Sequence, residues 1–119
     1  MTMTLPHDRP LPAPPMELLR GMLEDEFAVQ TARLMELTVY ARLPRRTGFD
    51  PQALEADAAS ARRRIASTAY ALKRMSEGTY GVCEACRQPI PLGRLRNEPS
   101  ASRCARCERS SPPDGPQAP

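Results

Sequence analysis

Four cysteines are the residues whose type and spacing most clearly predict chemistry. Cys83 and Cys86 form one Cys-x₂-Cys pair, and Cys104 and Cys107 form a second pair after seventeen intervening residues. Two such pairs at this separation are typical of a tetrahedral Cys₄ zinc site. All four positions would then be filled by protein sulfur, so none stays open for water or substrate. We therefore expect one structural zinc ion and no enzymatic site.

Other uses of four cysteines remain as alternatives. Two disulfides would require an oxidising compartment, and a redox-active Cys-x₂-Cys would use one reactive pair rather than two matched pairs. A rubredoxin-like iron site also takes two cysteine pairs. The lone histidine, His7, lies far from the cysteines in a proline-rich stretch, and we expect it to be inert.

Two long amphipathic segments precede the cysteines and must position them. In the first segment, residues 16–43, the apolar positions follow a heptad-like spacing once Gln30 is included: Leu19, Leu23, Phe27, Leu34, Leu37 and Ala41. In the second segment the spacing alternates between four and three: Leu54, Ala58, Ala61, Ile65, Thr68, Leu72 and Met75. Each pattern predicts a helix with a continuous apolar seam.

The ends of these helices are also marked in the sequence. Pro44 ends the first segment, because the residue before a proline is pushed out of the helical region. Asp50 and Pro51 are an N-cap and a first helical residue for the second segment, with Phe49 and Leu54 as a hydrophobic staple. Gly78 is suited to end it.

Matched lengths and a short connection predict a mainly α fold, an antiparallel coiled-coil hairpin followed by the Cys₄ finger. Each helix would be ~40 Å long. We expect the hairpin over 16–77, with its tip near 44–57, and the finger over 78–110. Two helices of an ordinary bundle are the alternative, and the hairpin could also pair with a partner or with itself. Acidic and basic residues mix at the tip: Arg45, Arg46, Asp50, Glu55 and Asp57.

The rest of the 119 residues carries compositional signals. Five of the 14 prolines fall in residues 1–15 and four in 112–119, so we expect disordered tails over 1–15 and 111–119. No apolar run approaches the ~20 residues of a membrane span, and the N-terminus lacks the apolar stretch of a signal peptide. These features predict a cytoplasmic protein. The formal charge of +3 is weak support for nucleic-acid binding.

The finger and its entry resemble a known family. Residues 71–83 read Ala-Leu-Lys-Arg-Met-Ser-Glu-Gly-Thr-Tyr-Gly-Val-Cys, and the sequence continues with Ile90, Arg94-Leu95, Pro99 and the second cysteine pair. This pattern resembles the zinc finger of the DksA/TraR family over roughly residues 70–110. The resemblance implies a factor whose coiled coil enters the secondary channel of bacterial RNA polymerase, with its tip near the catalytic Mg²⁺. It also implies cooperation with the alarmone ppGpp at the polymerase interface, and binding to the enzyme rather than to a DNA sequence.

The chain departs from the family pattern at two places. Aligned on Asp50, the family tip Asp-x-x-Asp-x-Ala becomes Asp50-x-x-Ala53-x-Glu55, with Asp57 one turn further on. Asp50, Glu55 and Asp57 are therefore the candidate effector residues. The position after Cys86 is commonly glycine and is Arg87 here, where a left-handed backbone would cost about 1 kcal/mol or more. An interaction adaptor for another protein is the second functional hypothesis, and a sequence-specific DNA-binding finger is the third.

Overall fold

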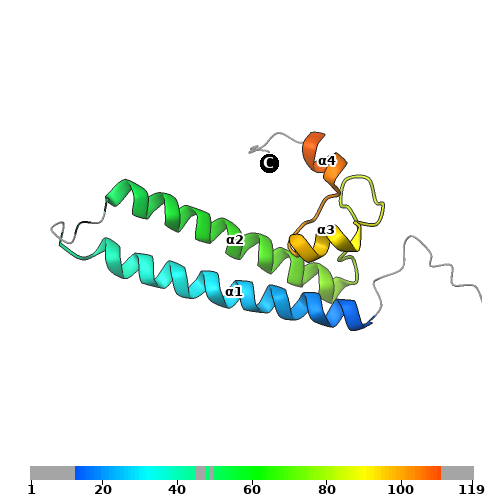
Figure 1. Cartoon of the computed structure of the whole chain (residues 1–119), viewed down its shortest axis with the longest axis horizontal. Coiled ribbons are helices and arrows are strands. Elements are labelled where there is room, and N and C mark those ends of the chain that lie inside the picture. The colour runs from blue at the N-terminus through cyan, green and yellow to red at the C-terminus, as the bar shows by residue number, and fades with distance from the viewer. Residues whose placement is uncertain (1–12, 45–47, 49, 111–119) are drawn as a thin grey trace, which may run out of the picture.

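The computed structural model describes residues 13–44, 48 and 50–110 as a helical hairpin with a small finger at its base (Figure 1). Helices α1 (Ala13–Ala41) and α2 (Pro51–Glu77) run antiparallel along the molecule, which is elongated at 67 × 30 × 22 Å. Two short helices, α3 (Leu92–Asn97) and α4 (Ala105–Ser110), belong to the finger. The predicted mainly α architecture is confirmed.

The helix ends follow the local signals in the sequence. The Asp50 side chain accepts a hydrogen bond from the Gln52 N–H (3.2 Å), and Pro51 occupies the first helical position. Gly78 adopts a left-handed conformation (φ 79°) and ends α2, with its N–H bonded to the carbonyls of Arg74 and Met75. The expected staple residue Phe49 lies outside the described residues, as do His7, Arg45 and Arg46.

The start of α1 differs from the expected tail over residues 1–15. The helix already begins at Ala13, and Pro14 and Pro15 belong to its first turn. Proline is tolerated there, because the first N–H groups of a helix have no intrahelical acceptor and its φ angle is already helical. Residues 1–12 and 111–119 are not described, so the remaining tail predictions stay predictions.

The interface between the two long helices uses most of the predicted seam. Leu19, Leu23 and Leu37 of α1 are buried, as are Ala61, Thr68 and Met75 of α2. Two α1 positions of the predicted seam, Phe27 and Ala41, are exposed, although Ala41 lines a hollow between the helices together with Leu54 and Ala58 of α2. After Leu23 the seam steps by three residues to Glu26, whose carboxylate reaches Arg64 of α2 at 3.3 Å.

A single core joins the base of the hairpin to the finger. Tyr80, Ile90 and Leu95 of the finger are almost completely buried. The hairpin residues in the same cluster are Leu19, Leu23, Ala71 and Met75. Because one apolar cluster crosses the junction, the finger is fixed in orientation relative to the helices. No helix in the described part of the chain is long and apolar enough to span a membrane.

Candidate metal centre and hairpin tip

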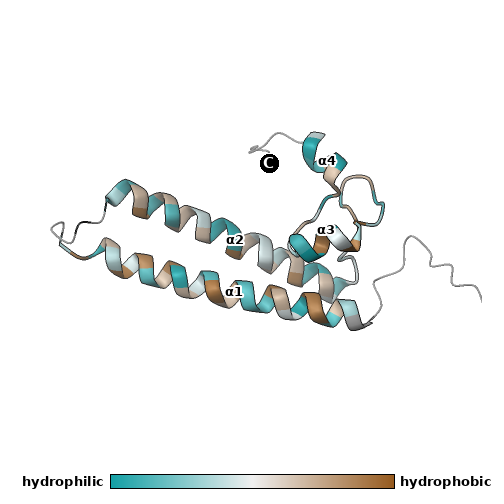
Figure 2. Cartoon of the chain, in the orientation of Figure 1, coloured by the Kyte–Doolittle hydropathy of each residue, from teal (hydrophilic) through white to brown (hydrophobic). Residues whose placement is uncertain are grey.

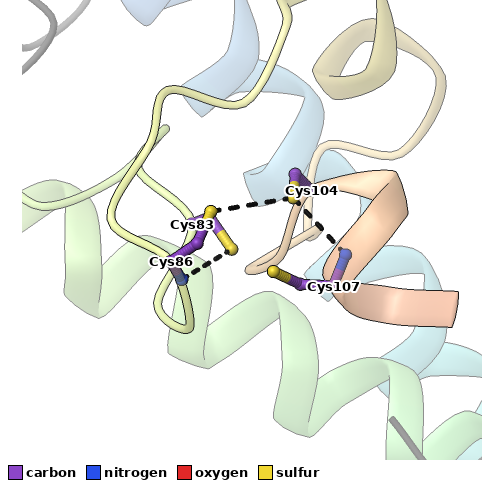
Figure 3. Close-up of side chains that lie close together, drawn as sticks. All are labelled: Cys83, Cys86, Cys104 and Cys107. Carbon is purple, nitrogen blue, oxygen red and sulfur yellow. Dashed lines mark hydrogen bonds between the residues drawn. The ribbon is translucent and has the colours of Figure 1, made fainter. Parts of the chain in front are cut away.

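The four predicted ligands come together in the finger (Figure 3). The sulfur atoms of Cys83, Cys86, Cys104 and Cys107 all lie within 4.8 Å of one another. A tetrahedral zinc ion with Zn–S bonds of ~2.3 Å requires sulfur atoms ~3.8 Å apart. The Sγ atoms of Cys86 and Cys104 are 3.9 Å apart, so the spacing across the two pairs fits one such ion.

Each cysteine pair forms a knuckle with the same local hydrogen bonding. The Cys86 N–H points to the Cys83 sulfur at 3.5 Å, and the Cys107 N–H points to the Cys104 sulfur at the same distance. Burial of Cys83 opposes its ionisation, but the N–H groups around it outweigh burial and lower the pKa of its thiol to about 6. Zinc binds the thiolate form, so this backbone arrangement favours metal binding.

The first knuckle contains a strained residue. Arg87 has φ 67°, and it is the one non-glycine residue with positive φ in the described part of the chain. Its N–H donates to the Cys83 carbonyl, and the Cys83 N–H donates to the Gln88 carbonyl. The left-handed backbone expected at this position is therefore present, and hydrogen bonds on both sides of Arg87 hold it there.

A buried arginine anchors the finger to the end of α2. The Arg74 side chain is 6% exposed, and its Nη2 donates to the carbonyl oxygens of Thr79 (2.7 Å) and Val82 (2.6 Å). Its guanidinium also lies 5.9 Å from the centre of the Tyr70 ring. The sequence analysis assigned no role to Arg74. Its position next to the seam residue Met75 was the one feature of the sequence that could have indicated burial.

A second junction is centred on Glu84, inside the first knuckle. Its carboxylate accepts hydrogen bonds from the Tyr70 hydroxyl of α2 (2.7 Å) and from the Ser102 hydroxyl (3.3 Å). Arg103 lies 3.4 Å from the same carboxylate. The network ties α2 to both halves of the finger, so Glu84 is a positioning residue that the sequence did not reveal.

The predicted effector acids lie along the first turns of α2 and are not gathered into one cluster. Asp50 caps the helix, Glu55 pairs with Arg62 at 2.9 Å, and Asp57 pairs with Arg33 of α1 at 3.6 Å. The ion pairs are exposed, so each contributes at most about 1 kcal/mol. Each acid thus has its own local partner and remains accessible from solvent.

A groove of about 700 Å³ lies between the middle of α2 and the finger. Its walls include Arg63, Arg64 and Ser67 of α2, with Asn97 and Ser100 of the finger. The carboxylates of Glu26 and Glu98 line the same groove, so its walls carry both cationic and anionic groups. Arg64 also pairs with Glu26, so Arg63 is the less committed of the two cations.

Comparison with known proteins identifies the finger. Residues 78–112 match the family of the prokaryotic dksA/traR C4-type zinc finger. An uncharacterised protein of Aquifex aeolicus (strain VF5) is 47% identical over 38 residues, which are 32% of this chain and 26% of that relative. The chain therefore spans about a quarter of the length of this curated relative.

The fold of the chain extends this likeness beyond the finger. The structure of transcription factor DksA2 from Pseudomonas aeruginosa superposes with a TM-score of 0.72, covering 82% of this chain and 83% of that one. At 20% sequence identity the superposition shows a shared fold. The protein thus carries a DksA/TraR C4-type zinc finger on a DksA-like helical hairpin, and its cysteine cluster fits one structural zinc ion.

Proposed function

We propose that this chain is a transcription regulator that binds bacterial RNA polymerase through its secondary channel. The observation that carries the proposal is the combination of a DksA/TraR finger with a hairpin of DksA-like fold. In this function Cys83, Cys86, Cys104 and Cys107 hold the zinc ion. The stem would reach into the channel and bring the tip near the active site. Reduced thiols fit a cytoplasmic location.

The division of labour follows from the fold. The shared core, Arg74 and Glu84 fix the finger against the base, so the finger and stem form one rigid docking body. Asp50, Glu55 and Asp57 lie at the opposite end of α2 from that base. Carboxylates at this end would act electrostatically on a metal ion or basic groups. We therefore propose that the stem and finger provide affinity and that the tip alters transcription.

Neutralising the tip acids tests this division. Asp57→Asn removes the charge and weakens an exposed ion pair, which costs at most about 1 kcal/mol of stability. Asp50→Asn removes the charge while keeping a good N-cap residue. We expect both variants to lose most of the effect on transcription in vitro and to bind polymerase core enzyme within about twofold of the parent.

Glu24→Gln is the matched control, because Glu24 is an exposed acid of α1 near the base. It should behave as the parent in both assays. If both tip variants still regulate transcription while polymerase binding persists, the tip is not the effector. Failure of the parent chain to bind core polymerase would instead favour the second candidate, an interaction adaptor for another protein partner.

Cooperation with ppGpp is a further part of this proposal. The groove beside Arg63 presents guanidinium and hydroxyl groups of the kind that bind phosphate, with the carboxylates of Glu26 and Glu98 in the same lining. We expect ppGpp to enhance the effect of the chain on transcription and Arg63→Ala to reduce that enhancement. If Arg63→Ala responds to ppGpp like the parent, the groove is not the ppGpp site. The proposed binding to polymerase does not depend on this result.

A further inference from the structure

The groove between α2 and the finger is lined by hydrogen-bond donors that have no partner in the described part of the chain. Figure 2 shows hydrophilic residues in the middle of α2 and at the end of α3, which form two of its walls. The lining side chains that make no hydrogen bond or ion pair to another described residue are Ser60, Arg63, Thr68, Asn97 and Ser100. Thr68 is only 1% exposed, and a hydroxyl buried without a hydrogen bond is costly. The groove is therefore suited to a ligand that is rich in hydrogen-bond acceptors.

One positive charge in this lining is not balanced by a neighbouring acid. The Glu26 carboxylate pairs with Arg64 at 3.3 Å, and the Glu98 carboxylate pairs with Arg94 at 3.8 Å. Arg63 forms no ion pair with another described residue. The groove thus combines unused donors with one uncompensated guanidinium. These groups fit an extended peptide segment that has free carbonyl oxygens and one carboxylate.

The chain itself contains such a segment directly after the finger. Residues 111–119 read Ser-Pro-Pro-Asp-Gly-Pro-Gln-Ala-Pro. Four of these nine residues are proline, which has a carbonyl acceptor and no N–H donor, so the acceptors of the segment outnumber its donors. Asp114 is its one charged side chain. The composition of the segment therefore complements the groove both in hydrogen bonding and in charge.

The segment begins close enough to reach the groove. It follows Ser110, the last residue of α4, and α4 lies on the same side of α2 as α3, whose Asn97 lines the groove (Figure 1). Nine extended residues span up to ~30 Å. The whole molecule measures 30 Å along its second axis, so this length is sufficient. Because the segment is tethered to the finger, its effective concentration at the groove is on the order of millimolar.

We propose that residues 111–119 dock in this groove, with Asp114 beside Arg63 and with carbonyl oxygens of the segment accepting hydrogen bonds from the lining, including the Thr68 hydroxyl. The docked segment balances the charge of Arg63 and supplies the missing acceptors. Any other ligand of the groove must displace the segment, which lowers the affinity for that ligand by the fraction of undocked chains. Competition with ppGpp rests on the proposed function, whereas the docking itself depends on neither ppGpp nor polymerase.

The test is NMR spectroscopy of the full zinc-loaded chain. Nuclear Overhauser effects should connect the Thr68 methyl group with proline protons of residues 111–119. Asp114→Arg replaces attraction to Arg63 by repulsion and should lower the ratio of docked to undocked chains about fivefold, which weakens these effects and shifts the amide resonances of the groove. Glu108→Arg is the matched control, because it makes the same charge change at an exposed residue of α4 that does not line the groove.

A charge exchange tests the pairing of Asp114 with Arg63. Arg63→Asp alone should weaken docking, and the double variant Arg63→Asp/Asp114→Arg should restore it, because the pairing is then only reversed. A parent chain without contacts between residues 111–119 and the groove overturns the proposal, as does equal weakening by Glu108→Arg or no rescue by the double variant. Contacts that are lost on dilution from about 500 to about 20 μM would mean docking on a second copy and would also overturn it. Unchanged resonances of the buried Tyr80 ring confirm that each variant is folded.

Discussion

Single residues of the finger carry strain and hydrogen bonds that can be tested one at a time. Arg87 occupies a left-handed conformation in the first zinc knuckle, where any side chain with a Cβ is disfavoured. Tyr80 is 2% exposed, and its hydroxyl donates to the Pro99 carbonyl at 2.8 Å. The first residue lowers the stability of the finger, and the second raises it.

We expect Arg87→Gly to stabilise the zinc-loaded protein by up to about 1 kcal/mol, because glycine adopts φ 67° without steric cost. Thermal unfolding followed by circular dichroism measures the change. Gln88→Gly is the control: Gln88 itself has no positive φ, so glycine there should destabilise by roughly 0.5–1 kcal/mol. A loss of stability in Arg87→Gly would show that the arginine side chain contributes more than its backbone costs.

Tyr80 makes stability depend on pH at the alkaline end. Burial raises the pKa of its phenol to about 12, against 10 for the unfolded chain. The folded state therefore keeps a proton that the unfolded state loses. The stabilisation is fully present below pH 10 and is lost as pH rises towards 12, on the order of 1 kcal/mol per pH unit.

Urea unfolding of the zinc-loaded chain at pH 9 and pH 11 tests this dependence. Tyr80→Phe should cost about 1 kcal/mol at pH 9, because it removes the hydrogen bond to Pro99, and should reduce the loss between the two pH values. In Tyr40→Phe, on α1, the loss should persist. An equally steep loss in Tyr80→Phe would rule out Tyr80 as its source.

At the scale of elements, the hairpin depends on a narrow seam of small and aliphatic residues. Ala61 is 1% exposed and lies between the helices, whereas Ile65 is only half-buried. Small residues at the seam let α1 and α2 approach closely, so a larger or charged side chain has no room there. Ala66, on the same helix, faces solvent.

Ala61→Asp and Ala66→Asp form a matched pair. At Ala61 the carboxylate would be buried without a partner, and we expect a loss of several kcal/mol in stability with cooperative melting of both helices. At Ala66 the same change should stay within about 0.5 kcal/mol. Circular dichroism at 222 nm during urea unfolding compares them, and equal destabilisation of the two variants would mean that the seam is assigned to the wrong face.

At the scale of the whole molecule, the finger and the base of the hairpin share one core. Leu19, Leu23 and Met75 pack in the same cluster as Tyr80 and Leu95. The finger therefore covers apolar surface of the helices, and loss of the metal should also lower the stability of the hairpin. The tip half of the hairpin, around Leu37 and Ala61, lies outside that cluster.

Removing zinc with a chelator should unfold the finger and lower the melting temperature of the hairpin by about 10 °C or more. Part of the helicity should remain, because the seam towards the tip does not depend on the finger. Cys104→Ser should give the same result. Adding zinc back should restore the melting temperature of the chelated parent chain but not that of Cys104→Ser. An unchanged melting temperature of the helices after metal loss would contradict the shared core. Metal analysis should find one zinc per chain.

The sequence by itself determined which cysteines cluster and where α2 begins and ends, because both depend on local patterns; the start of α1 at Ala13 was not predicted. Two Cys-x₂-Cys pairs, the Asp50-Pro51 start and Gly78 each act over a few residues, and the structure agrees with them. The strain at Arg87 was also predictable, since it is a property of one backbone position. Heptad spacing found most of the seam for the same reason.

Only the tertiary structure decided the contacts between residues far apart in the chain. The phase of α1 depends on its packing against α2, where Glu26 pairs with Arg64 and the predicted seam residue Phe27 is 38% exposed. The junction of Glu84 with Tyr70 and Ser102 requires the finger to fold back on α2. Such contacts leave no periodic signal, because each depends on the relative placement of whole elements and not on the spacing within one.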